Sequence, residues 1–278
     1  MIEPDGTLHR RNDPRSTDEL VQLALNEPDD DAAWEPVVVL HFRATNEVLQ
    51  KAELLCLSAE TRERKLGVDI LGQLGVPDRA FPDECFQVLT RSLRNETQPE
   101  VLEAIGVACG HLHDDRTVEL LAPLRCHLSA DVRLGVVNGI SRQNSPMAID
   151  FLIELSRDED DEVRDWATFG LGSMIDTDTP EIREALVSRL EDRNDDARGE
   201  ALVGLARRKD ERVIEPLIRE LTSENVGLLA LEAAEEVASH RLLPSLLLLK
   251  EAWSEDQDRH TGRLDDALRS CSPMQGLT

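Results

Sequence analysis

The chain has 278 residues, of which 40% are hydrophobic, and a formal net charge of −25 at pH 7. This apolar content is sufficient for a folded core, whereas the acidic field would repel a phosphate backbone, so the sequence predicts no nucleic-acid partner. No run of about 18 apolar residues occurs, which argues against a membrane span, and the charged N-terminus has no apolar signal core.

The five cysteines are scattered along the chain without paired spacing. An odd, dispersed set of this kind is typical of reduced thiols, so we expect a cytoplasmic protein. The acidic surface either serves solubility alone or favours a basic partner.

Both ends of the chain predict capping segments around a central array. Residues 1–16 are charged and predict a disordered tail, followed by a polar-faced starting helix at 17–27 and another helix at 47–57. At the other end, residues 261–269 predict a last helix before a tail at 272–278. Residues 17–271 should therefore form a single repeat domain.

Between these ends, a short pattern recurs every 29 to 38 residues. It has an anchor position at the start of a helix-like run, which is an arginine in four of seven cases and, in three of these, follows Val or Ala. A period in this range is typical of stacked repeats in which each unit contacts its neighbours. The seven anchor positions are Trp34, Arg64, Leu102, Arg133, Arg164, Arg198 and Gly227.

Two helices are predicted in each repeat, because apolar residues recur four apart and therefore share one helical face. Each face needs a neighbour, so the sequence predicts an all-α solenoid, an α/α superhelix of about seven stacked helical hairpins. The stripes of the first helices are Met147/Phe151/Leu155, Ile182/Leu186/Leu190 and Val213/Leu217/Leu221. Those of the second helices are Val101/Ile105/Cys109, Val132/Val136/Ile140, Val163/Ala167/Leu171, Ala197/Ala201/Leu205 and Val226/Ala230/Ala234.

Small residues recur near the end of the second helices, at Ala108, Gly139, Gly170, Gly204 and Ala233. Glycine inside a helix costs about 1 kcal/mol relative to alanine, so its recurrence needs a packing reason. We expect a neighbouring helix to approach closely at these positions.

Acidic residues gather in two turns before second helices, at 158–162 and at 192–196. Carboxylates in this place can accept hydrogen bonds from the N–H groups of the first helical turn. The turns lack the twelve-residue pattern of calcium loops, with its central Gly and final Glu, so capping is predicted rather than metal binding.

The anchors and the acids together resemble HEAT repeats of the short bacterial type, which are also found in phycobilin lyases. The resemblance covers about residues 30–255 and is carried by Asp158 with Arg164 and by Asp192 with Arg198, where the acid lies six positions before the arginine. It implies a right-handed superhelix whose arginine-bearing helices line the concave side. The chain departs from this ladder where Leu102 and Gly227 replace the arginine and where Ser58, Glu96 and His127 replace the aspartate.

One group of residues has the side chains that zinc prefers: Cys109, His111, His113, Cys126 and His127. Structural zinc sites usually have paired, short ligand spacings, which this group lacks. Cys109 also falls on a core stripe, and two histidines two apart on a helix would point in different directions. The sequence therefore predicts core and turn roles here, with no metal and no cofactor.

Motifs of common enzyme classes are absent from the sequence. It has no Gly-rich phosphate loop, no Gly-x-Ser-x-Gly turn and no paired-cysteine redox motif. No His is followed by Glu, the dipeptide that supplies a di-iron centre in hydroxylases of the HEAT type. DNA glycosylases of similar shape use a basic, aromatic-rich surface, which an acidic and aromatic-poor chain does not offer. We therefore predict that the protein is not an enzyme.

The richest aromatic spot of the chain is the segment 164–170, which contains Trp166 and Phe169. Asp165 in this segment would orient Arg164 or a partner's cation. In an alternative interpretation, Trp166 packs between repeats and Arg164 pairs with Asp158 to brace the turn. Because Trp and Arg are enriched in binding hot spots, a partner-binding surface is predicted along Arg133, Asn138, Arg164, Asp165, Trp166, Phe169 and Arg198.

These observations favour a monomeric, non-enzymatic scaffold or adaptor that binds a protein partner, of basic character, through its concave surface. One alternative is an enzyme or cofactor chaperone of the bilin-lyase type with a small ligand in the groove, although no residue specifies a tetrapyrrole. Another is an immunity or inhibitor protein that neutralises a basic enzyme.

Overall fold

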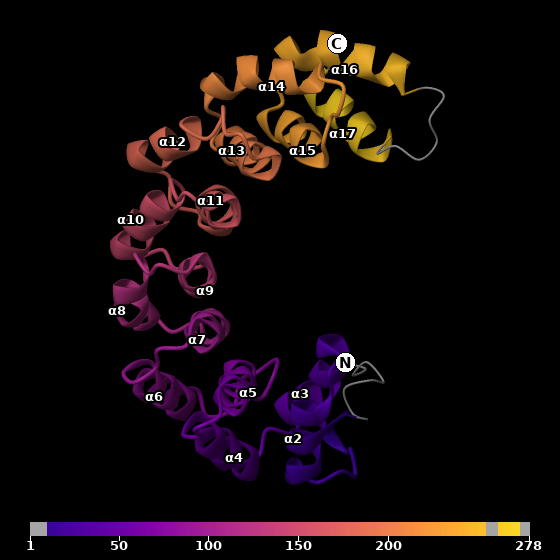
Figure 1. Cartoon of the computed structure of the whole chain (residues 1–278). Helices are drawn as coiled ribbons and strands as arrows, with labels where there is room; N and C mark the ends of the chain where they lie inside the picture. Colours follow the sequence, from indigo (N-terminus) through magenta and orange to yellow (C-terminus); the bar gives the residue numbers. More distant parts are fainter. Residues whose placement is uncertain (1–9, 254–260, 273–278) are drawn as a thin grey trace. The chain divides into compact units, whose positions relative to one another are not determined.

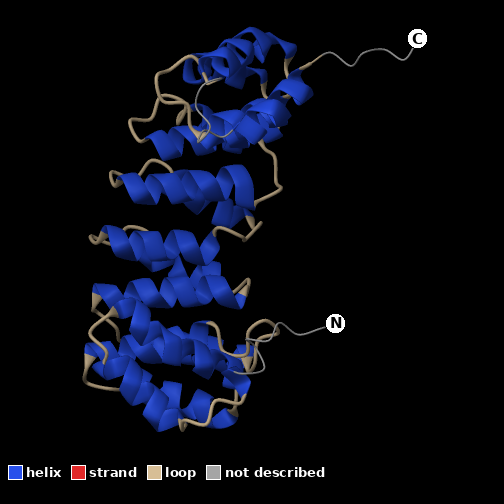
Figure 2. Ribbon diagram, turned by 90° about the vertical axis from the view of Figure 1, so that its right-hand side faces the viewer, coloured by secondary structure: helices blue, strands red, loops and turns tan. Residues whose placement is uncertain are grey.

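Helices provide all the regular secondary structure of the described residues, 10–253 and 261–272, in this computed structural model (Figure 1, Figure 2). The predicted all-α class is therefore confirmed. The sixteen α-helices are α2 (Thr17–Asn26), α3 (Asp30–Arg43), α4 (Asn46–Cys56), α5 (Thr61–Gly72), α6 (Pro82–Leu93), α7 (Pro99–Leu112), α8 (Thr117–Leu121), α9 (Ala130–Ile140), α10 (Pro146–Leu155), α11 (Asp161–Phe169), α12 (Pro180–Val187), α13 (Asp195–Arg207), α14 (Ile214–Leu221), α15 (Leu228–Val237), α16 (Leu243–Ala252) and α17 (Thr261–Cys271).

Within the described residues, consecutive helices pair into eight hairpins, from α2 with α3 to α16 with α17. This is one hairpin more than the seven anchors suggested, because the predicted last helix packs on α16 and completes a further pair. The chain divides into two compact units between Ile140 and Ser141. The first unit contains the hairpins from α2 to α9, and the second contains those from α10 to α17.

In the first unit, the second helices of successive hairpins pack on one another, α3 on α5, α5 on α7 and α7 on α9. The approach is very close between α7 and α9, where a Cβ on Gly106 would collide with the backbone of Gly135. A Cβ on Gly139 would lie 2.9 Å from the carbonyl oxygen of Gly106. The close approach predicted at Gly139 is therefore confirmed, since any larger residue would push the two helices apart.

In the second unit, the second helices of the hairpins form one row: α11, α13, α15 and α17. The first helices of the hairpins form another row next to it (Figure 1). A Cβ on Gly204 of α13 would lie 2.6 Å from the Cα of Gly172, which again places two backbones in contact. The stripes between the rows are buried as predicted, with Ile182, Leu186 and Leu217 all at 0% exposure.

Two of the predicted stripes are wrong at their first residue. Met147 lies in the first turn of α10 and is 41% exposed, while the adjacent face is buried through Ala148 and Leu152. Val226 is half-buried and precedes α15, which begins only at Leu228. Both errors fall at helix starts, where a spacing of four does not reveal which residue is the first to be covered.

The prediction that carboxylates cap the second helices is confirmed for the turn 158–162 and wrong for the turn 192–196, where an amide is the cap. The side chain of Asp160 accepts hydrogen bonds from the backbone N–H groups of Glu162 and Val163, over 3.0 and 3.2 Å. Asn194 caps α13 in the same way, through the N–H of Ala197 at 2.8 Å. These side chains satisfy N–H groups that have no partner within their helix.

Part of each predicted tail belongs to the described structure. Arg15 pairs with Asp13 and with Glu35 of α3, at 2.7 and 3.0 Å. At the other end, the backbone N–H of Ser272 donates a hydrogen bond to the carbonyl oxygen of Leu268 in α17, over 3.1 Å. The remaining parts of the predicted tails, 1–9 and 273–278, lie outside the described residues. None of the described helices combines the length and the apolar character needed to cross a lipid bilayer.

Candidate partner-binding surface

The anchor arginines share one main-chain contact. Nη1 of each donates a hydrogen bond to the carbonyl oxygen of the residue six positions earlier, over 2.8 to 3.1 Å. Every amino acid supplies such a carbonyl, so this bond forms whether or not the earlier residue is acidic. The four donor and acceptor pairs are Arg64 with Ser58, Arg133 with His127, Arg164 with Asp158 and Arg198 with Asp192.

Arg64 and Arg164 each have a carboxylate partner in the following repeat, and Arg164 also pairs with Asp161 of its own turn. Arg164 lies 3.1 Å from a carboxylate oxygen of Asp192, and Arg64 lies 2.7 Å from one of Glu96. The expected brace between Arg164 and Asp158 exists, but Asp158 contributes its carbonyl oxygen to that contact. An acid six positions before one arginine therefore serves the arginine of the preceding repeat.

Two of the predicted site residues, Arg133 and Arg164, are buried, with 7% and 5% exposure. The hydrogen bond to Asp192 raises the pKa of Arg164. Burial alone would raise the pKa of Asp192, but the bond from Arg164 brings it below the ordinary value. These arginines thus hold turns and repeats together, and the structure does not expose them to a partner.

Asn138 and Arg198 are only partly accessible. Asn138 is half-buried in α9, and its carbonyl oxygen faces Gly110 of α7 so closely that a side chain there would collide with it. The side chain of Arg198 is 22% exposed and pairs with Asp195 and Glu220, at 2.9 and 3.3 Å. Both residues therefore have structural contacts already.

The aromatic residues of α11 are accessible. Trp166 is 41% exposed, and its ring meets that of Phe169 edge to face, with the centroids 5.7 Å apart and the planes at 88°. Phe169 ends α11, and a π-helical turn follows at Gly170–Met174. Such turns shift the phase of a helix and are frequent at functional sites. Trp166 is therefore only partly packed, and much of its ring is available for contact.

Asp165, next to Trp166, is a half-buried carboxylate. Burial, followed by the negative charges of Asp196 and Glu162, raises its pKa to about 6. Its Oδ1 is buried and has no hydrogen-bond partner among the described residues. The hydrogen bonds of Arg164 go to other groups, so the expected role of Asp165 in orienting Arg164 is not seen.

Glu200 of α13 is a site residue that the sequence reasoning missed. Its pKa is raised to about 7, first by burial and then by the charges of Asp165 and Glu232. The hydroxyl of Ser173 donates to it over 3.4 Å. Glu200 lies two positions after the anchor Arg198, as Trp166 lies two positions after the anchor Arg164. A comparison of the repeats at that position would therefore have found Glu200.

We call Asp165, Trp166, Phe169 and Glu200 the acidic–aromatic patch. It combines Asp165 and Glu200, whose charges repel, with the exposed indole of Trp166, which follows Asp165 in the sequence; the residues lie on helices α11 and α13, which pack together. Carboxylates with raised pKa values near an accessible hydrophobic group mark a functional-site candidate. The arrangement suits recognition of a cation, because a positive charge would relieve the repulsion.

The side chains considered for zinc have separate roles. Cys109 is at 0% exposure, and burial raises the pKa of its thiol to about 12. His113 ends α7 in a left-handed conformation, and Nδ1 of His127 accepts from the N–H of Ser129. Across residues 10–253 and 261–272, no three His, Cys, Asp or Glu side chains gather as a metal site.

Replacement of Glu200 tests whether its ionised carboxylate destabilises the fold. A carboxylate whose pKa of about 7 in the folded protein exceeds its ordinary value of 4.5 destabilises the fold when it is ionised. This cost is absent below about pH 4.5, grows as the pH rises to about 7 and is constant above that. After allowance for solvent screening, Glu200→Gln should raise the free energy of unfolding by about 1–2 kcal/mol at pH 8 and leave it unchanged near pH 4.5. Urea denaturation at both pH values measures this.

A matched control is Glu224→Gln, which changes an exposed carboxylate outside the patch. It should shift the free energy of unfolding by less than about 0.5 kcal/mol at either pH. A loss of stability in Glu200→Gln at pH 8 would contradict this prediction, because it would show that the ionised carboxylate stabilises the fold.

Comparisons with known proteins identify a repeat family and a solved structure with a similar fold. A model of HEAT repeats matches residues 86–172 and 154–238. The chain is 29% identical to Protein YibA of Escherichia coli (strain K12) over 238 residues, which are 84% of this chain and 84% of YibA. The X-ray structure of Escherichia coli YibA has a TM-score of 0.74 at 25% identity and covers 98% of this chain and 97% of its own.

A more distant likeness concerns the fold alone. A structure of Kap95p, described as inducing the switch loops of RanGDP to adopt the GTP-bound conformation, has a TM-score of 0.62 at 15% identity. It covers 97% of this chain and 41% of that one. The finer resemblance to the phycobilin-lyase type stays a prediction.

Proposed function

The chain belongs to the HEAT-repeat family, and on this premise we propose that it is a non-enzymatic scaffold or adaptor that binds a basic protein partner. The contact surface in this proposal is the acidic–aromatic patch on α11 and α13. The observation that carries the proposal is the pair of carboxylates Asp165 and Glu200, both held at a raised pKa by burial and by neighbouring negative charge.

A partner's lysine or arginine would change the energy of this pair. In the unbound protein each ionised carboxylate is partly desolvated and faces another negative charge, which is unfavourable. A cation placed between them replaces repulsion with attraction, and it offers donors to Oδ1 of Asp165. The net charge of −25 would also accelerate the encounter with a basic protein at low salt.

Trp166 supplies the apolar part of the contact in this proposal. Exposed Trp residues flanked by charged groups are common binding hot spots. The Kap95p structure supports the class of partner, since its description has a protein of this fold bind RanGDP.

Trp166→Ala separates binding from packing. If Trp166 is a contact residue, the variant should bind the partner at least about tenfold more weakly while the thermal unfolding midpoint changes little, because the side chain is 41% exposed. Equal amounts of immobilised wild-type and variant chains are exposed to an extract of the producing cells. Mass spectrometry quantifies the captured proteins, and calorimetry measures the affinity of each enriched one.

The matched control is Trp34→Ala, since Trp34 is 40% exposed but lies in α3 of the first unit. It should leave capture unchanged. A large fall in the midpoint of Trp166→Ala with the same proteins captured would show that Trp166 is a packing residue. A visible absorbance that co-purifies in stoichiometric amount, with no captured protein, would indicate a small ligand instead.

A further inference from the structure

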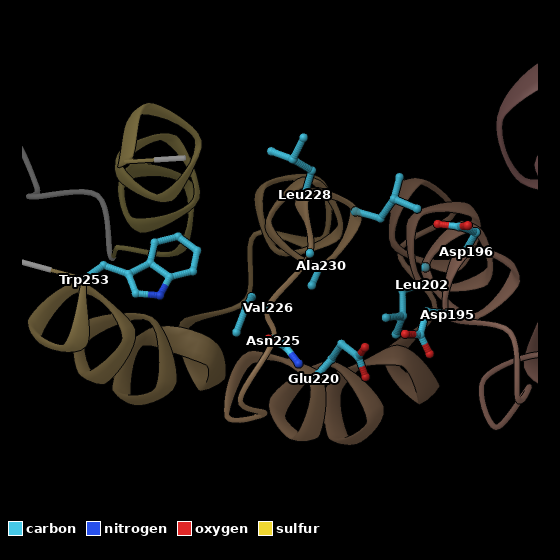
Figure 3. A pocket seen from close by; sticks show the side chains of 12 residues that line it. Asp195, Asp196, Leu202, Glu220, Asn225, Val226, Leu228, Ala230 and Trp253 are labelled. Atoms are coloured by element: carbon cyan, nitrogen blue, oxygen red, sulfur yellow. The ribbon is translucent and has the colours of Figure 1, made fainter. Parts of the chain in front are cut away.

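Two pockets of the chain differ in whether their charges are balanced from within. In the second unit, a groove of about 560 Å³ lies beside the start of α15, and Figure 3 shows the carboxylates of Asp195 and Glu220 at its edge. Both carboxylates pair with Arg198, at 2.9 and 3.3 Å, so each already has a cation. A pocket of about 330 Å³ in the first unit is lined by residues of mainly the opposite charge, and these are not balanced in this way.

The pocket of the first unit lies between the end of α3 and the loop that follows α5. The backbone N–H of Gly75 fixes this loop to α3 by a hydrogen bond of 2.8 Å to the carbonyl oxygen of His41. The N–H of Ala80 closes the loop on the carbonyl oxygen of Leu74, also over 2.8 Å. We call this site the arginine pocket, and its lining residues with a charged or aromatic side chain are Arg11, Phe42, Arg43, Asp78 and Arg79.

Arg79 is half-buried and has no acidic partner among the described residues. Its Nη1 is buried without a hydrogen bond, and burial lowers the pKa of the guanidinium. The groups that its charge reaches are neutral near pH 7. The pKa of His41 is lowered to about 4, first by burial and to a lesser extent by the charge of Arg79, and burial raises the pKa of the Cys85 thiol to about 12. A partly desolvated cation in these surroundings is unfavourable while the pocket is empty.

The backbone of Arg79 is unfavourable as well. Its φ of 60° lies in the left-handed region, which a residue with a side chain adopts at a cost and which glycine adopts readily. Neither the backbone nor the charge of Arg79 therefore favours arginine for the sake of the fold. Recognition of an anion would account for a guanidinium at this position.

Arg43 is held in place by neutral groups and keeps further donors. Its Nη2 donates hydrogen bonds to the carbonyl oxygens of Asp13 and Arg15, over 3.0 and 2.6 Å. Its Nε and Nη1 have no partner within residues 10–253 and 261–272. The charge of Asp13 also acts on Arg43, but that carboxylate pairs with Arg15 at 2.7 Å. A guanidinium that is oriented by carbonyl oxygens is preorganised to bind an anion.

The lining residues carry an excess of positive charge in an otherwise acidic chain. Arg43 and Arg79 are accompanied by a single lining carboxylate, the exposed Asp78, so the excess remains even when Arg11 is left out. Arg10 adds a further cation nearby, since its guanidinium carbon lies 5.6 Å from the ring centroid of Phe42. Salt screens distant charges over about 8–10 Å, so a small anion in the pocket responds mainly to these arginines. A long polyanion would also meet the acidic field of the rest of the chain.

We propose that the arginine pocket binds a phosphate group, either as the free ion or as part of a small molecule. Phosphate fits better than a carboxylate, because two planar guanidinium groups offer more donors than the two oxygens of one carboxylate can accept. A volume of about 330 Å³ is at the lower end of the range for small-molecule sites, so an organic group attached to the phosphate also has room. The arginine pocket shares no residue with the acidic–aromatic patch, and the proposal does not depend on the proposed function.

Two phosphate compounds test the site in the full chain. Inorganic phosphate and glycerol phosphate are titrated separately at neutral pH, with chloride added to keep the ionic strength constant and low. Calorimetry measures the affinity, and the amide chemical shifts of Gly75 and Arg79 locate the binding. At least one compound should bind with a dissociation constant of about 1 mM or below. Tighter binding of glycerol phosphate would identify a phosphate ester as the ligand, and tighter binding of inorganic phosphate would identify the free ion. Binding of neither, or binding without shifts in this loop, would overturn the proposal.

Substitutions with opposite expected signs give the decisive comparison. Arg79→Gln should weaken the binding of the better compound at least about tenfold, because a charge-assisted hydrogen bond is lost. Asp78→Asn should strengthen it at least about twofold, because the carboxylate that lines the pocket is removed. The matched control is Arg94→Gln, which changes the net charge as Arg79→Gln does but at an exposed residue of the first unit outside the pocket. It should bind like the wild type. Equal losses in Arg79→Gln and Arg94→Gln would show that only net charge matters and would overturn the proposal.

The thermal unfolding midpoint separates binding from a structural role of Arg79. In buffer without phosphate, Arg79→Gln should have a midpoint equal to or above that of the wild type, because it removes a half-buried charge that has no acidic partner among the described residues. A lower midpoint would show that Arg79 stabilises the empty protein, and this too would overturn the proposal.

Discussion

Arg164→Ala should lower the free energy of unfolding by about 2–4 kcal/mol at neutral pH, less than for a wholly unpaired buried charge because Asp192 keeps Arg189 at 3.1 Å. The side chains of Arg164 and Asp192 are 6% and 5% exposed, so the variant leaves a buried carboxylate without this cation. It also removes the donor to the carbonyl oxygens of Asp158 and Glu159. Urea denaturation followed by circular dichroism measures the loss. It should shrink as the pH falls below about 3.8, where Asp192 becomes protonated in the unfolded chain.

Arg193→Ala is the control for this prediction, because Arg193 also pairs with Asp161 in the same turn but is 73% exposed. An exposed ion pair contributes little, so the control should lose less than about 1 kcal/mol. Similar losses in the two variants would mean that burial does not decide the strength of the ladder.

Leu186→Asp should unfold its part of the array. Leu186 of α12 is at 0% exposure, and its methyl groups lie where a Cβ on Gly204 would come within 3.0 to 3.2 Å. An unpaired carboxylate there has neither water nor a cation, which costs on the order of 5 kcal/mol or more. Since each repeat is stabilised by its neighbours, limited proteolysis should cut first in α12 and α13, with a loss of helical signal.

Leu248→Asp gives the comparison for the same change at a 63% exposed position of α16. It should keep the wild-type proteolysis pattern and lose less than about 1 kcal/mol. If Leu186→Asp also kept the wild-type proteolysis pattern, the tight packing of α12 against α13 would be contradicted.

The pairing of the helices could be predicted because apolar residues recur four positions apart, which places them on one face of a helix. Ile182 and Leu186 were assigned to the core from spacing alone, and both are buried. Spacing failed at Met147, since two neighbouring faces of α10 are apolar and only the contacts between helices select one. The close contact of Gly106 with Gly135 was also missed, because both lie outside the small-residue position used for the comparison.

The candidate site was predicted less completely than the fold. Asp165 and Trp166 were found from local composition, but Glu200 gains its raised pKa from the approach of α11 to α13, which no single repeat encodes. The burial of Arg164 could not be predicted either. The sequence suggested Asp158, in the same turn, as its partner, whereas the structure pairs it with Asp192 of the next repeat.

The carbonyl acceptors of the anchor arginines have a consequence for how such an array can change over time. Ser58, His127, Asp158 and Asp192 all serve the same bond, because the accepting atom belongs to the main chain. Mutation at these turns therefore leaves the register of the arginine intact. Apart from Asp192, whose carboxylate pairs with the buried Arg164, these turn side chains can vary one repeat at a time and give new surface chemistry without loss of this bond.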